Sequence, residues 1–330
     1  MKLTSTFRAA TAALLCCTGI ALAGGEGWNS DFAAAKKEAQ ESKKDLILDF
    51  TGSDWCAYCI KLNEEVFKTD AFKSFAKDKF VLVEVDFPQD EKKLSDATKK
   101  QNEELAEKYP IEGYPTLILT DAEGRPYAVT GYEEGGAGPY VKNLEKLAAK
   151  KKVRDENLQA AEKAEGVAKA KALFAALEAM ALPTELEKKF YGDLEEKIKA
   201  ADPKDETGFA KKQAAAERVA KFQQSLQELG ENGDFDGALA LTDKTIAEGG
   251  LDPEALQQVT LTKAMILANQ GKFDDAIKVV EEAKKIAPDS EITPKLGEFV
   301  SQLQEAKQQA AAEKAEQEKA DKKPEEKKGE

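Results

Sequence analysis

The chain has 330 residues, 42% of them apolar, and a formal net charge of −13. This length predicts two or three domains, and the apolar fraction is sufficient for a packed core, which excludes a wholly disordered protein. The negative charge disfavours nucleic acids and anionic membrane surfaces as partners. Because the chain contains no histidine, Cys-His and Ser-His catalysis and most zinc sites are also excluded.

The first 23 residues, MKLTSTFRAATAALLCCTGIALA, have the pattern of a secretory signal peptide. Lys2 and Arg8 precede an apolar run, and Ala21-Leu22-Ala23 has the small-x-small form of a cleavage site. Cleavage near Ala23 would remove two cations and change the formal charge from −13 to −15. We therefore expect an exported protein, periplasmic or secreted.

Two other interpretations of this segment remain open. One is a membrane span, although the apolar run is shorter than the roughly 20 residues that a span requires. The other is a lipid anchor on Cys16 or Cys17, although neither follows the small residue that a lipobox would place there. With a cleaved signal there is no stable membrane span, and Cys56 and Cys59 are the remaining cysteines in a compartment where disulfides form.

Residues 24–150 alternate helix and strand signals and predict an α/β domain. Short runs rich in β-branched and apolar residues predict four strands, at 45–50, 80–87, 116–120 and 125–132. The turn Asp121-Ala122-Glu123-Gly124 makes the last two an antiparallel hairpin. A first helix, capped by Asn29 or Ser30, precedes these strands, others separate them, and a last one covers about 139–150. This order predicts a mixed sheet with helices on both faces.

After Lys150 the strand signals stop, and residues 151–303 predict an all-α domain rich in Ala, Glu, Lys and Leu. We expect helices at 155–181, from 184 to about 201, and at 206–229. Similar segments that begin at Gly233 and Gly271, 38 residues apart, resemble tetratricopeptide hairpins over about 219–288. These helices either bind a peptide or protein partner or simply pack against one another.

The last residues, 304–330, consist mainly of Ala, Glu, Lys and Gln, with nearly balanced charge and no aromatic side chain. This composition predicts a disordered tail or a frayed helix of coiled-coil character.

The candidate reactive residues lie in FTGSDWCAYCIKL, residues 50–62, where Cys56 and Cys59 are three residues apart at the start of a predicted helix. Helical periodicity places Cys59 on one face with Leu62 and Val66, whereas Cys56 lies in the first turn. Free N–H groups and the helix dipole would lower the pKa of Cys56 from about 8.5 toward neutrality. We therefore expect Cys56 to attack and Cys59 to resolve the resulting mixed disulfide.

Two other roles for this pair have to be weighed. A permanent structural disulfide between them would close only a very small loop and add little stability. A tetrahedral zinc clip needs four ligands, which two cysteines without histidine cannot supply unless a second chain contributes. We therefore expect no metal, and no cofactor other than the redox-active disulfide Cys56–Cys59.

The stretch DFTGSDWCAYC, together with Gly113-Tyr114-Pro115-Thr116 before a strand, resembles the exported thioredoxin-like domains of the thioredoxin superfamily. The resemblance covers roughly residues 28–150 and implies a thioredoxin fold. It implies that Cys56 is the nucleophile and Cys59 the resolving thiol. It also implies that Pro115 is a cis proline facing the disulfide and that Asp49 is the buried acid that serves Cys59.

The same resemblance implies a substrate-binding surface around the cysteines. Trp55 is the flanking aromatic residue, and Tyr114 contributes to a backbone edge where an extended segment of a partner docks. Tyr58 and Thr116 complete this predicted surface. The dipeptide Ala57-Tyr58 differs from the Gly-Pro of thioredoxins and lacks the histidine of strong oxidants, which predicts a moderately reducing pair.

These features predict an exported thiol-disulfide oxidoreductase that reduces or isomerises protein disulfides through a mixed disulfide on Cys56. Its partners would be protein thiols and disulfides and a separate redox donor, with a peptide or protein ligand on the helical domain. The alternative is a non-enzymatic adaptor whose helices bind partners and whose cysteine pair is vestigial or structural.

Overall fold

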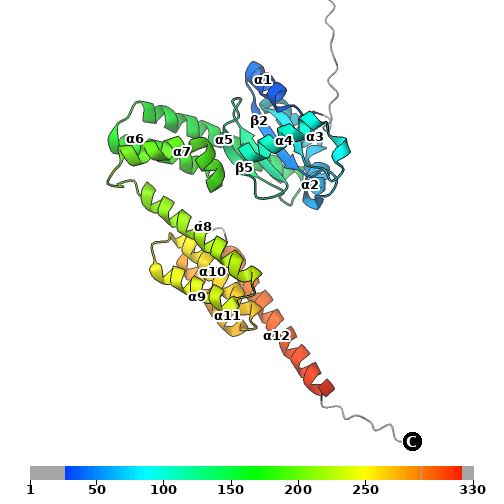
Figure 1. Ribbon diagram of the computed structural model, residues 1–330, viewed down its shortest axis with the longest axis vertical. Coiled ribbons are helices and arrows are strands. Elements are labelled where there is room, and N and C mark those ends of the chain that lie inside the picture. Colours follow the sequence, from blue (N-terminus) through cyan, green and yellow to red (C-terminus); the bar gives the residue numbers. More distant parts are fainter. Residues whose placement is uncertain (1–26, 291, 322–330) are drawn as a thin grey trace, which may run out of the picture. The chain divides into compact units, whose positions relative to one another are not determined.

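The computed structural model describes residues 27–290 and 292–321 (Figure 1). The predicted signal peptide and its cleavage site lie outside these residues. The chain forms two compact units, one ending at Pro203 and the other beginning at Lys204. Among the described residues, none of the helices combines the length and the apolar character that a membrane span needs.

The first unit contains a five-stranded sheet and the helices that surround it. Its strands are β1 (Trp28–Asn29), β2 (Asp45–Thr51), β3 (Phe80–Asp86), β4 (Thr116–Thr120) and β5 (Pro126–Thr130). Its helices are α1 (Phe32–Ser42), α2 (Ala57–Leu62), the π-helix η1 (Asn63–Phe67), α3 (Asp70–Lys79), the 3-10 helix η2 (Glu91–Lys93), α4 (Asp96–Lys108), α5 (Ala137–Glu162), α6 (Gly166–Met180) and α7 (Thr184–Ala201).

The sheet has the strand order β1-β3-β2-β4-β5. Strand β3 is parallel to both β1 and β2, whereas β4 is antiparallel to β2 and to β5. The predicted mixed sheet and its final hairpin are therefore confirmed. The sequence did not predict β1, which is only two residues long and is held by Trp28, whose ring lies 4.9 Å from that of Phe67.

Helices cover both faces of this sheet. Phe50 of β2 contacts Tyr109, which ends α4, and Tyr109 in turn contacts Phe32 of α1. The neighbouring residue Asp49 interacts with Tyr140 of α5. Because successive strand residues point to opposite faces, α1 and α4 lie on one face and α5 on the other. Helix α3 and η1 contact α5 and share its face, which confirms the predicted fold class.

The start of α1 differs from the prediction. The cap is Asp31, whose carboxylate accepts a hydrogen bond of 2.9 Å from the backbone N–H of Ala34. The predicted cap at Asn29 or Ser30 is wrong, because Asn29 is already paired with Val83 in the sheet. The observed cap therefore lies one residue after Ser30 and two after Asn29.

Helix α5 runs through the position where the composition changes. We expected a helix ending at 150 and a second at 155–181, but α5 continues to Glu162 and α6 begins at Gly166, whose φ is 54°. Arg154 of α5 is buried, with its guanidinium 3.0 Å from the Asp121 carboxylate. The Tyr191 hydroxyl of α7 accepts a hydrogen bond from Arg154 and donates one to the carbonyl of Pro126. These contacts extend the first compact unit to Pro203.

The second unit is all-helical, as predicted. It contains α8 (Phe209–Glu231), α9 (Phe235–Glu248), α10 (Pro253–Asn269), α11 (Phe273–Ile286), the 3-10 helix η3 (Thr293–Lys295) and α12 (Leu296–Asp321). Each of these α-helices contacts the next, and small and branched residues of α10 and α11 form the core with Leu296 and Leu303. The resemblance of 219–288 to tetratricopeptide hairpins stays a prediction.

Candidate active site

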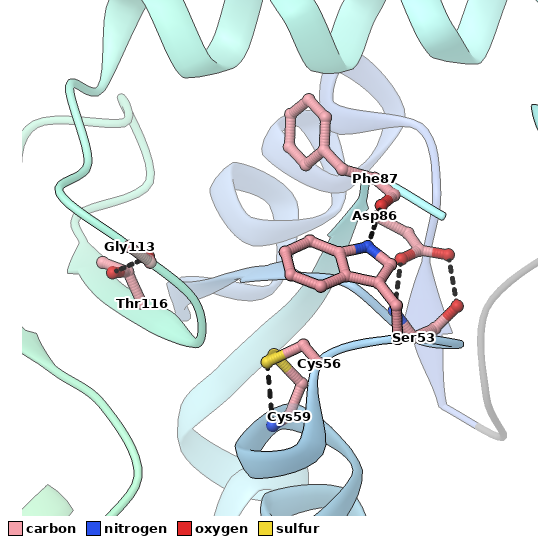
Figure 2. Close-up of a disulfide and its surroundings, with 8 residues drawn as sticks. Ser53, Cys56, Cys59, Asp86, Phe87, Gly113 and Thr116 are labelled. Atoms are coloured by element: carbon pink, nitrogen blue, oxygen red, sulfur yellow. Dashed lines mark hydrogen bonds between the residues drawn. A yellow bond between two sulfur atoms is a disulfide. The ribbon is translucent and has the colours of Figure 1, made fainter. Parts of the chain in front are cut away.

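The two cysteines lie where β2 leads into α2. Cys56 is the N-cap of α2, with an extended backbone, and its Sγ accepts a hydrogen bond of 3.2 Å from the N–H of Cys59. The two residues form a disulfide, with Cα atoms 5.2 Å apart, and both are buried (Figure 2). The sulfur of Cys56 therefore lies at the helix N-terminus, where free N–H groups and the helix dipole favour negative charge.

Three consecutive residues before Cys56 attach this segment to the end of β3 and the loop that follows. Ser53 donates two hydrogen bonds to the Asp86 carboxylate, from its N–H at 2.9 Å and from its hydroxyl at 2.7 Å (Figure 2). Trp55 donates from Nε1 to the carbonyl of Phe87 at 2.8 Å. Asn102 of α4 in turn donates to the backbone carbonyl of Asp86. The indole and the helix start are thus fixed together.

Asp54 is the third anchor. Its carboxylate accepts hydrogen bonds from Lys93 and from the backbone N–H groups of Gln89 and Asp90. The bond from Lys93, with those from the backbone, lowers the pKa of Asp54 to about 2. Sequence reasoning did not find Ser53, Asp54 or Asp86 as site residues, because their pairing joins segments more than thirty residues apart.

Gly52 lets the indole lie directly against the backbone. A Cβ atom at this position would lie 2.5 Å from the Trp55 ring, which is closer than side chains approach one another. The carbonyl of Gly52 also accepts a hydrogen bond of 2.9 Å from the N–H of Cys56. The glycine of the Thr-Gly-Ser stretch is therefore required by the packing of Trp55.

The loop before β4 carries the other predicted residues. The Tyr114–Pro115 peptide bond is cis, and the Thr116 hydroxyl donates a hydrogen bond of 2.7 Å to the carbonyl of Gly113 (Figure 2). The ring of Tyr114 lies 5.6 Å from that of Trp55 and 5.7 Å from that of Phe87. The structure thus places Tyr114 and Trp55 in contact, and joins both to the loop after β3.

Tyr58 lies between the two cysteines in sequence and points to solvent, with 58% of its surface exposed. Its ring centroid is 5.4 Å from that of Tyr132, in the loop after β5. Lys61 lies near both rings, and the Tyr132 hydroxyl donates a hydrogen bond to Glu65. Sequence reasoning did not find Tyr132, which lies far from the cysteines along the chain.

Asp49 is buried in β2, on the sheet face that α5 covers. Its Oδ1 has no hydrogen-bond partner among the described residues. Burial, followed by repulsion from Glu84 and Asp86, raises the pKa of Asp49 well above its usual value. Glu84 is its direct partner across β2 and β3, and burial together with Asp86 raises the pKa of Glu84 to about 7. Glu84 was also missed, although an acid within the apolar run FVLVEVDF is the signal that could have found it.

Comparisons with known proteins identify a family and several relatives. Residues 32–137 match the family model of the thioredoxin-like domain. The disulfide bond reductase DsbH of Chlamydia pneumoniae is 39% identical over 117 residues, which are 36% of this chain and 69% of that protein. The thioredoxin-related protein DsbJ of the same organism is 32% identical over 98 residues, which are 30% of this chain and 28% of DsbJ.

Two solved structures are also similar. A DsbH oxidoreductase is 34% identical and covers 42% of this chain and 94% of its own, with a TM-score of 0.36. The oxidised C-terminal domain of Neisseria meningitidis DsbD is 18% identical and covers 35% of this chain and 90% of its own, with a TM-score of 0.27. On the strength of its identity to DsbH over two thirds of that protein, this chain belongs to the thioredoxin-like family and is a homologue of DsbH.

Proposed function

We propose that this chain reduces disulfide bonds in other proteins, with Cys56 as the attacking thiolate and Cys59 as the resolving thiol. The observation that carries the proposal is the position of Cys56 as the N-cap of α2, in a disulfide with Cys59 of the same helix. The name of the relative DsbH, disulfide bond reductase, supports the same direction of reaction.

The proposed reaction starts from the reduced pair. The Cys56 thiolate attacks one sulfur of a partner disulfide, so that a Cys56–partner bond forms, the partner's own S–S bond breaks, and one partner thiolate leaves. Cys59 then loses its proton, attacks Cys56 and displaces the second partner thiolate. The partner gains two electrons, and its two thiolates take up protons from the solvent. The chain becomes oxidised at Cys56–Cys59, and a separate dithiol donor has to reduce it again.

Asp49 is proposed as the proton acceptor for Cys59. It lies on the sheet face shared by η1 and α5, and its raised pKa makes it a better proton acceptor than an ordinary carboxylate. Export of the chain after cleavage near Ala23 is part of the same proposal, because an exported compartment is where such disulfides form. The helical second unit is proposed to hold the partner protein.

Replacement of each cysteine separates the two proposed roles. We expect reduced Cys59→Ser to accumulate a covalent adduct with a disulfide-containing protein such as insulin, because nothing then resolves the Cys56 mixed disulfide. Cys56→Ser, the matched control, should form little or none. The adduct is measured on non-reducing gels and by intact mass.

Equal adduct formation by both variants would contradict the assignment of roles. A wild-type protein that reduces no disulfide, with partner capture unaffected by loss of both cysteines, would instead favour the adaptor.

A further inference from the structure

Tyr58 and Tyr132, called here the tyrosine pair, form an aromatic surface beside the reactive disulfide. Their ring centroids are 5.4 Å apart with the planes inclined by 34°. Tyr58 is more than half exposed, and Tyr132 is partly buried. Exposed aromatic side chains that lie together contribute large contact areas at protein interfaces, and they lose little conformational entropy when a partner binds.

The tyrosine pair is held in place before any partner arrives. The Tyr132 hydroxyl donates a hydrogen bond of 2.9 Å to the Glu65 carboxylate, and Tyr58 and Glu65 are seven residues apart along α2 and η1. This bond is the main cause of the raised pKa of Tyr132, and the hydroxyl therefore stays protonated and keeps donating the hydrogen bond. The ammonium of Lys61 lies 6.0 Å and 5.9 Å from the two ring centroids, so an exposed and movable side chain of the protein itself covers the rings.

The tyrosine pair is continuous with the edge where a partner chain is predicted to dock. Tyr132 directly follows Gly131, and a Cβ atom on Gly131 would lie only 3.0 Å from the carbonyl oxygen of Pro115. Tyr58 lies between Cys56 and Cys59 in the sequence, and its exposed ring is in contact with that of Tyr132. The loop before β4, with its cis proline, and the loop after β5, which carries Tyr132, therefore lie side by side.

Charge around the tyrosine pair restricts what can occupy it. Glu65 is bonded to Tyr132, and Glu134 also acts on the Tyr132 hydroxyl. Glu133 follows Tyr132 directly and binds Thr130 and Asn143. These carboxylates would repel acidic side chains of a partner, and Lys61 would repel basic ones. An uncharged aromatic side chain is repelled by neither and packs favourably on tyrosine rings.

We infer that the tyrosine pair selects protein disulfides in which an aromatic residue lies next to the reacting cysteine. The aromatic side chain packs on Tyr58 and Tyr132 in place of Lys61 while the partner sulfur reaches Cys56. This inference rests on the proposed function and specifies its substrate class.

The test compares two symmetrical peptide disulfides that differ only in the residue after cysteine, Phe or Ser. Reduced protein is mixed with each peptide, and the released peptide thiol is followed by chromatography in a single turnover, so that no donor is needed. The ratio of the two rates is divided by the same ratio for dithiothreitol, which corrects for intrinsic reactivity. An aromatic contact predicts a corrected ratio of roughly 2 to 10 for the wild-type protein.

Tyr132→Ala and Tyr58→Ala should each lower this ratio toward one. Tyr132→Ala is the more decisive variant, because it leaves Cys56-Ala57-Tyr58-Cys59 unchanged. Phe235→Ala, which removes an aromatic residue 42% exposed in the other compact unit, is the matched control and should keep the wild-type ratio.

A corrected ratio near one in the wild-type protein, or a ratio unchanged by Tyr132→Ala, would overturn the inference and leave the proposed reductase intact. Failure of the wild-type protein to reduce either peptide would overturn the proposed function and the inference with it.

Discussion

Asp49 and Glu84 place two carboxyl groups side by side within a largely apolar sheet. They are direct partners across β2 and β3 and therefore point to the same face, where Asp86 also lies two residues beyond Glu84. Ionising Asp49 and Glu84 in the folded protein is unfavourable, because burial opposes both charges, Asp86 repels both, and Glu84 also repels Asp49. The folded protein consequently binds protons more tightly here than the unfolded chain does.

This arrangement predicts that stability falls as the pH rises. The pKa of Glu84 is about 7 when folded against 4.5 in its ordinary state, so its stabilising protonated form is lost between about pH 4.5 and 7. Glutamine carries no charge at any pH, so Glu84→Gln should not lose stability at this position as the pH rises. Above pH 7 its free energy of unfolding should exceed that of the wild-type protein by on the order of 1–3 kcal/mol. Urea denaturation of both proteins at pH 4.5, 6 and 7.5 measures the difference.

Asp49 remains in the Glu84→Gln protein and contributes in the same direction, so a smaller pH dependence should persist. Glu112→Gln, at an exposed position, is the control and should follow the wild-type curve. An unchanged pH dependence in Glu84→Gln would show that this carboxyl group is not protonated in the folded state.

At the scale of elements, the segment from Gly52 to Trp55 determines where α2 begins. Gly52→Ala would drive a methyl group into the indole, so we expect the free energy of unfolding to fall by about 1–3 kcal/mol. Trp55 should also lose its hydrogen bond to Phe87, which its fluorescence spectrum would report together with urea denaturation.

Ser53→Ala serves as the comparison, since it removes one hydrogen bond to Asp86 and keeps the backbone bond. It should cost about 1 kcal/mol and leave the tryptophan spectrum unchanged. If Gly52→Ala were as stable as the wild-type protein, the close approach of the indole would not constrain this segment.

The regular strands could be predicted because β2, β3 and β4 are mostly apolar runs, as expected of strands buried on both faces. Two-residue β1 shows no such pattern and depends on a pairing with Leu82 and Val83. The break between α5 and α6 was not predicted, because the segment around Gly166 is rich in helix-forming residues and a single glycine does not by itself end a helix.

The candidate site was likewise only partly predictable from the sequence. Its cysteines, the proline and the flanking aromatic residues could be found, because they lie in short motifs. The partners Asp86, Lys93 and Tyr132 could not, because only the folded chain brings them to Ser53, Asp54 and Tyr58.

At the scale of the whole molecule, α5, α6 and α7 belong to the same compact unit as the sheet. Phe190 of α7 stacks on Tyr109 with ring centroids 4.9 Å apart, and Lys108 lies near both rings. Tyr191 and Arg154 add the buried polar contacts to Pro126 and Asp121. The composition changes at Lys150, but the packing does not end until α7 is complete.

Shortened chains test this division. A protein spanning 24–203 should unfold in one cooperative transition, whereas one spanning 24–150 should be less stable by at least about 2 kcal/mol, because it exposes Tyr109 and unpairs Asp121. Urea denaturation followed by far-ultraviolet circular dichroism compares the two. Equal stability of the two would mean that α6 and α7 contribute nothing to the sheet domain.

The continuity of α5 also sets a rule for how this protein can change in length. Tyr140, near Asp49, and Arg154, paired with Asp121, lie on one uninterrupted helix, 14 positions or about 21 Å apart. Each residue inserted between them would turn everything that follows by about 100° about the helix axis, and Arg154 would then face away from Asp121. An insertion of seven residues would nearly restore the helical phase, but it would move Arg154 by about 10.5 Å along the helix axis and out of reach of Asp121. The length of α5 between Tyr140 and Arg154 is therefore fixed by rotation as much as by distance.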